Sequence, residues 1–259
     1  MTTLLIDADG VAFKAASAAQ TSIQWDDDVF TSHGDLNTAK QIFMADIDKF
    51  RDVTDADATV ILCYSCPTRR YFRHDLLASY KGNRKGTAAP LALKALKEWS
   101  AEKFLTKTKP HLEADDVLGI LATDKRLVRG ERIIVSIDKD MRQIPGRYLN
   151  AGSPTAGFER IIPTFAERFL WLQLLTGDVV DGYGGCPGTG PVKAETILDK
   201  GAPYWEHVLD AYEKAYKNTP MDPGQQFETM VNVARILTSS SYNFKTKEPI
   251  LWQKPTLTS

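Results

Sequence analysis

Near its start the chain reads Thr3-Leu4-Leu5-Ile6-Asp7-Ala8-Asp9-Gly10. The residues from Thr3 to Ile6 are apolar or β-branched, which predicts a short buried strand, and two aspartates follow it directly. Residues 58–64 and 132–137 have the same character, and Asp138 follows the second of them. The sequence therefore predicts three buried strands, two of which end in acidic side chains.

Helical patterns lie between and after these strands. Residues 12–19, 37–51, 91–104 and 114–129 are predicted helices. Strands that alternate with helices indicate an α/β fold with a mainly parallel sheet, in which functional sites lie beyond the carboxyl ends of the strands. We therefore expect Asp7 and Asp138 to meet at one sheet edge, together with Ser65 and Cys66 after the second strand.

The pattern changes after residue 162. Pro163 is well placed to begin a helix that runs to residue 175, because proline suits the first helical turn. A glycine-rich turn at residues 182–190 follows, and further helices are expected near residues 192–199, 204–216 and 225–239. We predict a catalytic α/β domain over residues 1–162 and a helical portion over residues 163–259.

The composition is that of an ordinary globular protein. Of its 259 residues, 43% are hydrophobic and 25% charged. The pattern contains no signal peptide or membrane span, and three cysteines are an odd number, so we expect a reducing compartment. That compartment would be the cytoplasm, or the host cytoplasm for a phage-encoded chain. The CxxC run from Cys63 to Cys66 has no second half at zinc spacing, which favours an ordinary strand end.

Basic residues are concentrated in one stretch of a chain whose formal net charge is only −1. Residues 69–109 contain eleven Lys and Arg against three Asp and Glu, a surplus of eight positive charges. A solvated, lysine-rich helix face would explain this as well as a function would. Combined with an acidic centre elsewhere, it fits a metal-dependent enzyme that acts on a polyanion.

Four acidic groups are spread along the chain. Each has an ordinary explanation as a helix cap, a turn or a shared helix face. Together they fit divalent cations, which prefer oxygen ligands, and two such ions about 3.5–4 Å apart can activate a water and stabilise a leaving oxygen. The groups are Asp7-Ala8-Asp9, Glu113-Ala114-Asp115-Asp116, Asp138-Lys139-Asp140 and Asp178-Val179-Val180-Asp181.

At these residues the sequence resembles the flap-endonuclease-like 5′ nucleases, which are PIN-like, and within them the 5′→3′ exonucleases of short-tailed phages. Any one motif is weak, but several in the family's order cover nearly the whole chain. The matching pieces are Leu5-Ile6-Asp7, Tyr80-Lys81-Gly82-Asn83-Arg84-Lys85, Glu113 to Asp116, Ser136-Ile137-Asp138-Lys139-Asp140, Thr176-Gly177-Asp178-Val179-Val180-Asp181-Gly182, Ala234-Arg235-Ile236-Leu237, Tyr242-Asn243-Phe244 and Leu251-Trp252.

The resemblance implies a PIN-like fold with a helix-three-turn-helix DNA-binding element, and two Mg²⁺ or Mn²⁺ ions as cofactors. By position, the first metal site would take Asp7, Glu113, Asp115 and Asp116, and the second Asp138, Asp140, Asp178 and Asp181. Asp7 and Asp138 would be catalytic, and the role of Asp9 stays open. The implied reaction is hydrolysis from a 5′ end of duplex DNA, with flaps and RNA primers as further substrates.

Other residues are assigned to DNA by the same resemblance. Lys81 and Arg84 would meet the reacting phosphate, where a positive group stabilises developing charge. Tyr80 would stack on a base near the 5′ end, and Lys85 would add a DNA contact. Gly185, Gly188, Gly190 and Lys193 would hold the duplex backbone at the hairpin of the helix-three-turn-helix. The expected partners are DNA, RNA–DNA hybrids, and replication or recombination proteins.

One departure from the family pattern stands out. The family has an Asp after the second strand, where this chain has Ser65 or Cys66. A thiol is a poor ligand for Mg²⁺, so first-site affinity is expected to be altered. Two alternatives therefore stay open: a protein that holds branched DNA without cutting it, and, from Asp7-Ala8-Asp9, a haloacid-dehalogenase-like phosphatase with Asp7 as its nucleophile.

Overall fold

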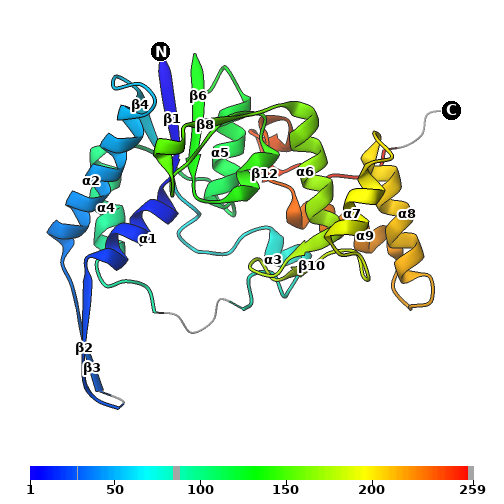
Figure 1. The fold of residues 1–259 in the computed structure, drawn as a ribbon, viewed down its shortest axis with the longest axis horizontal. Helices are drawn as coiled ribbons and strands as arrows, with labels where there is room; N and C mark the ends of the chain where they lie inside the picture. Colours follow the sequence, from blue (N-terminus) through cyan, green and yellow to red (C-terminus); the bar gives the residue numbers. More distant parts are fainter. Residues whose placement is uncertain (28, 84–87, 256–259) are drawn as a thin grey trace.

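A six-stranded sheet organises the first half of the chain. The computed structural model describes residues 1–27, 29–83 and 88–255. The strand order is β5-β4-β1-β6-β7-β8 (Figure 1), and every neighbouring pair is parallel except β7 with β8. This confirms the mainly parallel α/β fold. The strands are β1 (Thr2–Asp7), β4 (Thr59–Cys63), β5 (Leu105–Lys107), β6 (Glu131–Ser136), β7 (Gly146–Asn150) and β8 (Phe158–Ile161).

Helices cover both faces of the sheet. Because side chains alternate along a strand, Leu4 and Ile6 of β1 face one core and Leu5 faces the other. The first core includes α1 (Ala8–Ala18), α2 (Leu36–Asp52) and α4 (Leu93–Lys103). The second includes α5 (Ala114–Thr123). A strand buried on both faces explains the unbroken apolar run from which the fold was predicted.

The second half forms a helical layer beside the sheet (Figure 1, yellow-green to orange). The predicted helices at 163–175 and 204–216 are confirmed, and the one near 225–239 ends early, at Ala234. Fully buried Tyr212 and Phe227 centre this third core. Its elements are α6 (Pro163–Thr176), β9 (Gly177–Asp178), β10 (Tyr183–Gly184), α7 (Pro191–Leu198), α8 (Tyr204–Tyr216) and α9 (Pro223–Ala234).

The chain after α9 returns to the α/β half. Ile236, Leu237 and Tyr242 belong to the same core as α5, and β11 (Tyr242–Asn243) pairs with β12 (Glu248–Pro249). The helical portion therefore does not stand apart from the sheet. In the part of the chain that the structure describes, no helix is long and apolar enough to cross a membrane.

The structure differs from the elements predicted above in three local respects. The segment from residue 69, for which no helix was predicted, contains α3 (Arg73–Leu76), and Phe72, Arg73 and Tyr80 are buried; its part at 84–87 lies outside the described residues. The helix expected to reach 129 ends at Thr123, where the Asp124 carboxylate accepts the Arg126 amide instead. The ribbon of β2 (Gln20–Asp26) and β3 (Val29–Gly34) was not predicted.

Candidate active site

Asp7 lies at the carboxyl end of β1 and caps helix α1. Its carboxylate accepts a hydrogen bond from the Ser136 hydroxyl of β6 at 2.9 Å, and faces the amide of Gly10 at 3.5 Å. Ser136 Oγ also accepts the amide of Asp138 at 3.0 Å. One serine, which the sequence analysis missed, therefore joins the two acids that end neighbouring parallel strands.

Asp9 does not share these contacts. One of its oxygens accepts the Ser65 amide at 2.8 Å and the other pairs with Lys97 of α4. The Lys97 Nζ also lies 5.1 Å from the centre of the Tyr64 ring. Asp9 thus has a positive partner supplied by the protein, whereas Asp7 forms no ion pair within the described residues.

Helix α5 contributes a second acidic group at its first turn. Glu113 is the N-cap residue, and its carboxylate accepts the Tyr80 hydroxyl at 2.7 Å and Arg73 at 3.0 Å. Burial alone would raise the pKa of Glu113, but Arg73 and Lys81 outweigh it, so the pKa is lowered. Glu113 is therefore held ionised at this position.

Asp116 departs from its predicted role as a metal ligand. It has no exposed surface, and both of its oxygens bind Arg73, at 2.7 and 2.8 Å. They also accept the amides of Leu237 and Glu113. With its oxygens occupied in this way, Asp116 anchors α5 to α3 and to the returning chain. We therefore leave Asp116 out of the proposed metal sites.

Arg73 is the main residue that the sequence analysis missed. It was counted only among the basic residues, but its side chain is buried and donates to the carbonyls of Val233 and Arg235 besides the two acids. Nothing in the spacing distinguishes it from its exposed neighbours Arg69 and Arg70. Only the tertiary fold shows that one of the three arginines is internal.

Lys81 lies among the carboxylates, and Tyr80 is buried next to them. The Lys81 Nζ contacts Glu113 and lies 3.5 Å from Asp181. Tyr80 is only 3% exposed, so the expected stacking of its ring on a DNA base is wrong. The ring packs in the helical core and the hydroxyl binds Glu113 and Asp181. Arg84 and Lys85 lie outside the described residues.

The remaining acids come from two further segments. Asp140 follows Asp138 in the short helix η1 (Lys139–Gln143), and accepts Gln173 of α6 at 2.6 Å. The Asp178 carboxylate accepts the amides of Val180 at 2.7 Å and of Asp181 at 3.2 Å, which folds the turn between β9 and β10. This turn places Asp178 and Asp181, which belong to the helical portion, near the sheet edge.

These acids lie near enough to one another to raise each other's pKa. Burial, then Asp9 and Asp138, raise the pKa of Asp7 to about 6. Burial, then Asp7 and Asp138, raise the pKa of Asp115. Burial, then Asp138 and Asp178, raise the pKa of Asp140 to about 7. We call the set the acidic cluster: Asp7, Asp115, Asp138, Asp140, Asp178 and Asp181.

The acidic cluster fits small divalent cations. No three acidic, His or Cys side chains of the described chain close around one point as a complete metal cage. Mg²⁺, however, is usually bound through one or two carboxylates with waters and substrate phosphates completing its shell. A cavity of about 20 Å³, bordered by Asp115, Asp140 and Asp181, has room for roughly one water or ion. Uncompensated repulsion within the cluster is the kind that a bound cation relieves.

Ser65 and Cys66, which stand where the family has an Asp, have different surroundings in the structure. The Ser65 hydroxyl accepts the Ala114 amide at 3.0 Å, and its own amide binds Asp9. The Cys66 thiol instead lies 3.3 Å from the Thr68 hydroxyl. Ser65, not Cys66, therefore stands between Asp9 and the start of α5.

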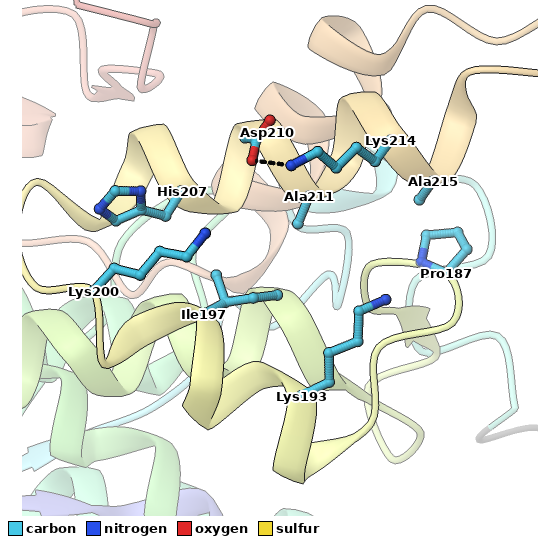
Figure 2. A pocket seen from close by; sticks show the side chains of 9 residues that line it. All are labelled: Pro187, Lys193, Ile197, Lys200, His207, Asp210, Ala211, Lys214 and Ala215. Carbon is cyan, nitrogen blue, oxygen red and sulfur yellow. Dashed lines mark hydrogen bonds and ion pairs between the residues drawn. The ribbon is translucent and has the colours of Figure 1, made fainter.

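The glycine-rich hairpin joins α6 to α7 as expected. A side chain at Gly185 would lie 2.3 Å from the Leu175 carbonyl, so this glycine serves close packing of the backbone. Gly188 has φ of +68° and open space around it, and Gly190 caps α7. The Lys193 Nζ lies 3.1 Å from the Gly188 carbonyl and borders a basic pocket between α7 and α8 (Figure 2).

Comparison with known proteins finds nucleases that align with nearly the whole chain. A family model described as "5'-3' exonuclease, N-terminal resolvase-like domain" matches residues 2–152. The exodeoxyribonuclease of Enterobacteria phage T3 is 28% identical, with 96% of this chain and 92% of that protein covered. The exonuclease of Escherichia phage T7 is also 28% identical, over 96% and 93%.

A flap endonuclease of Shewanella oneidensis is 34% identical over 49% of this chain and 52% of its own length. Among solved structures, the bacteriophage T5 D15 protein co-crystallised with metal ions gives a TM-score of 0.64 at 18% identity, covering 90% of this chain and 89% of its own. That likeness confirms the fold. The chain belongs to the 5′–3′ exonuclease family of 5′ nucleases.

Proposed function

We propose that the protein is a metal-dependent 5′→3′ exodeoxyribonuclease that hydrolyses duplex DNA from its 5′ ends. The observation that carries the proposal is the acidic cluster, in which carboxylates from separate segments of the chain face one another at one sheet edge. Phage relatives that align over nearly their whole length are an exodeoxyribonuclease and an exonuclease. Flaps and RNA primers are proposed as further substrates.

Two Mg²⁺ or Mn²⁺ ions would be held by the acidic cluster and Glu113. Such ions supply activation of a water and neutralisation of charge on the phosphate. In this assignment Asp7, Glu113 and Asp115 belong to the first site, and Asp138, Asp140, Asp178 and Asp181 to the second. Solved T5 relatives carry metal ions, one described with zinc, which supports divalent metals without selecting one.

The chain's own groups orient the substrate. Lys81, now paired with Glu113 and Asp181, is placed to exchange these contacts for a phosphate oxygen once cations compensate the acids. Gly188 and Gly190 leave room for a DNA backbone beside the start of α7. In this proposal residues 1–162 supply most of the cutting site. Residues 163–259 add Asp178 and Asp181 to it and hold the duplex without reading its sequence. A T5 flap endonuclease relative was crystallised with DNA.

The two alternatives have less support. A phosphatase with Asp7 as nucleophile leaves the acids of α5 and Lys81 without a role, and none of the relatives described above belongs to that class. The only support for a non-cleaving DNA-binding protein was the absence of the family's Asp after β4. Since Asp9 and Ser65 occupy that place and the other acids remain, cleavage is the simpler proposal.

The test is digestion of 5′-labelled duplex, nicked and flapped DNA with Mg²⁺ or Mn²⁺. We expect short products from the 5′ end, with Asp138→Ala abolishing cleavage and leaving DNA affinity unchanged. Asp46→Ala, at an acid paired with Lys14 on the surface, is the control and should cut normally. Full activity of Asp138→Ala, or release of inorganic phosphate as the main product, would contradict the proposal.

A further inference from the structure

A second basic surface lies around the end of β5. It combines Lys107 at the end of β5, Lys109 just after it, and the hairpin of β11 and β12 near the end of the chain. The Lys109 Nζ lies 4.4 Å from the centre of the Tyr242 ring and 5.3 Å from that of Phe244. Two segments more than 130 residues apart in sequence (Lys109 and Tyr242) are thus joined by one side chain.

The turn of this hairpin has a defined shape. The Asn243 side chain accepts the amides of Lys245 at 2.9 Å and of Thr246 at 3.2 Å. The Lys247 amide donates to the Asn243 carbonyl at 2.8 Å, with φ of +62° at Lys247. Since such a φ is unfavourable for a residue with a side chain, the turn is held by these bonds. It presents Phe244, Lys245 and Lys247 to solvent.

The lysines of this surface repel one another. Burial, then Lys107 and Lys247, lower the pKa of Lys109. Within the described residues, no acid forms an ion pair with Lys107, Lys109, Lys245 or Lys247. Like charges kept together without an acidic partner cost free energy, which an added polyanion would recover.

The surface is close to the proposed cutting site. Asp7 of β1 pairs in register with Cys63 of β4, and Cys63 with Lys107 of β5. Neighbouring strands lie about 4.8 Å apart, so the backbones of Lys107 and Asp7 are about 10 Å apart along the same sheet edge. A strand emerging from the acidic cluster would reach Lys107 within a few nucleotides.

An exposed aromatic ring on this surface favours single-stranded over duplex DNA. The Phe244 side chain is 42% exposed, and its ring stands edge-on to Tyr242, with centroids 5.2 Å apart. Bases stack on such rings only where they are unpaired, whereas a duplex keeps its bases stacked on each other. Lysines around an exposed ring therefore favour a single strand.

We propose that Lys107, Lys109, Phe244 and Lys247 form a binding site for a single-stranded segment of the DNA substrate, continuous with the acidic cluster along the sheet edge. The inference rests on the proposed function, because it assigns this segment to the same substrate that the acidic cluster cuts. The lysines neutralise phosphates and Phe244 stacks on one base.

The test measures binding in EDTA, where no cleavage occurs, by fluorescence anisotropy with a single-stranded oligonucleotide, a blunt duplex, and the duplex with a single-stranded extension. Lys107→Ala/Lys247→Ala changes two exposed residues and is expected to fold normally. We expect its salt slope on the single strand to fall by about 0.7 for each phosphate that is no longer neutralised. Phe244→Ala should weaken single-strand binding on the order of tenfold.

The control is Lys49→Ala/Lys125→Ala, at exposed lysines in the last turn of α2 and just beyond the end of α5. It should bind all three DNAs as the wild type does, and the two variants of the basic surface should keep wild-type affinity for the blunt duplex. An unchanged single-strand slope and affinity in both of these variants, or equal weakening on the blunt duplex, would overturn the inference. Absence of cleavage by the wild-type protein with either metal would instead count against the proposed function alone.

Discussion

Ser65 and Cys66 show how adjacent residues can have unrelated surroundings. Ser65 contacts the start of α5 and Asp9, while the Cys66 thiol faces Thr68. The place of the family's missing Asp, which the sequence left open between these two residues, is therefore better matched by Ser65. Successive side chains at a strand end point in different directions, and this direction decides whether Ser65 or Cys66 can reach a cation.

We predict that Ser65→Asp lowers the Mg²⁺ concentration needed for half-maximal cleavage several-fold, because it adds an oxygen ligand beside Asp9 and α5. Cleavage rates over a Mg²⁺ titration check this. Cys66→Asp is the matched control and should leave the requirement unchanged. A lowered requirement in Cys66→Asp alone would reverse the assignment.

Arg73 is predicted to be a large contributor to stability. Arg73→Met would leave Asp116 buried without its charged partner and Glu113 paired only with Lys81, which costs about 3–5 kcal/mol. Urea unfolding followed by circular dichroism measures the change. Arg70→Met removes an exposed pair with Asp75 and should change stability by less than about 1 kcal/mol. Similar destabilisation in the two variants would refute the special role of Arg73.

At the scale of elements, helix α5 depends on the chain that returns after α9. Gly119 lies in the middle of α5, and a side chain there would come within 2.2 Å of the Leu237 carbonyl. Leu237 in turn donates its amide to Asp116 at the start of the same helix. The returning segment therefore fixes the position of the α5 acids, which is why residues beyond 235 matter for a site at the sheet edge.

We expect Gly119→Ala to destabilise the protein by about 1–3 kcal/mol through overpacking, although alanine favours an isolated helix by about 1 kcal/mol over glycine. Gly10→Ala in α1 is the comparison, since its new side chain would meet only ordinary contacts at 3.6 Å. It should be neutral or stabilising. Thermal unfolding of both variants measures the two effects, and equal melting temperatures would contradict the packing argument.

At the scale of the whole molecule, the charge distribution sets how stability depends on pH. The pKa of Asp7 is raised from 3.8 to about 6 and that of Asp140 from 3.8 to about 7, first by burial. The folded state thus binds these protons more tightly than the unfolded chain does. Their contribution to the free energy of unfolding is fully present below about pH 4 and is lost as pH rises through 6 to 7.

Asp140→Asn should therefore raise the melting temperature of the metal-free protein at pH 8, by about 5 °C, and change it little at pH 4. Scans in EDTA at both pH values measure this. Asp48→Asn, at an acid on the surface of α2, controls for the change in net charge. A gain at pH 4 that matched the gain at pH 8 would show that ionisation of the buried Asp140 carboxylate is not the cause.

Local sequence determined the strands, most helices and the types of residue at the site. The apolar run of residues 3–6 and the acid after it predicted both β1 and the sheet edge, because side-chain periodicity and strand ends are local properties. The confirmed helices at 163–175 and 204–216 were likewise set by their own patterns.

Tertiary structure alone decided which polar groups are internal. Arg73 and Tyr80 have the local sequence of an exposed connection, yet both are buried. Arg73 binds Asp116 of α5 and the Val233 carbonyl of α9, and Tyr80 packs in the core of the helical portion. The occupied carboxylate of Asp116 and the contact of Lys109 with Tyr242 also depend on segments more than 100 residues away. Such contacts are set by how distant surfaces fit together, and the sequence around each residue carries no record of them.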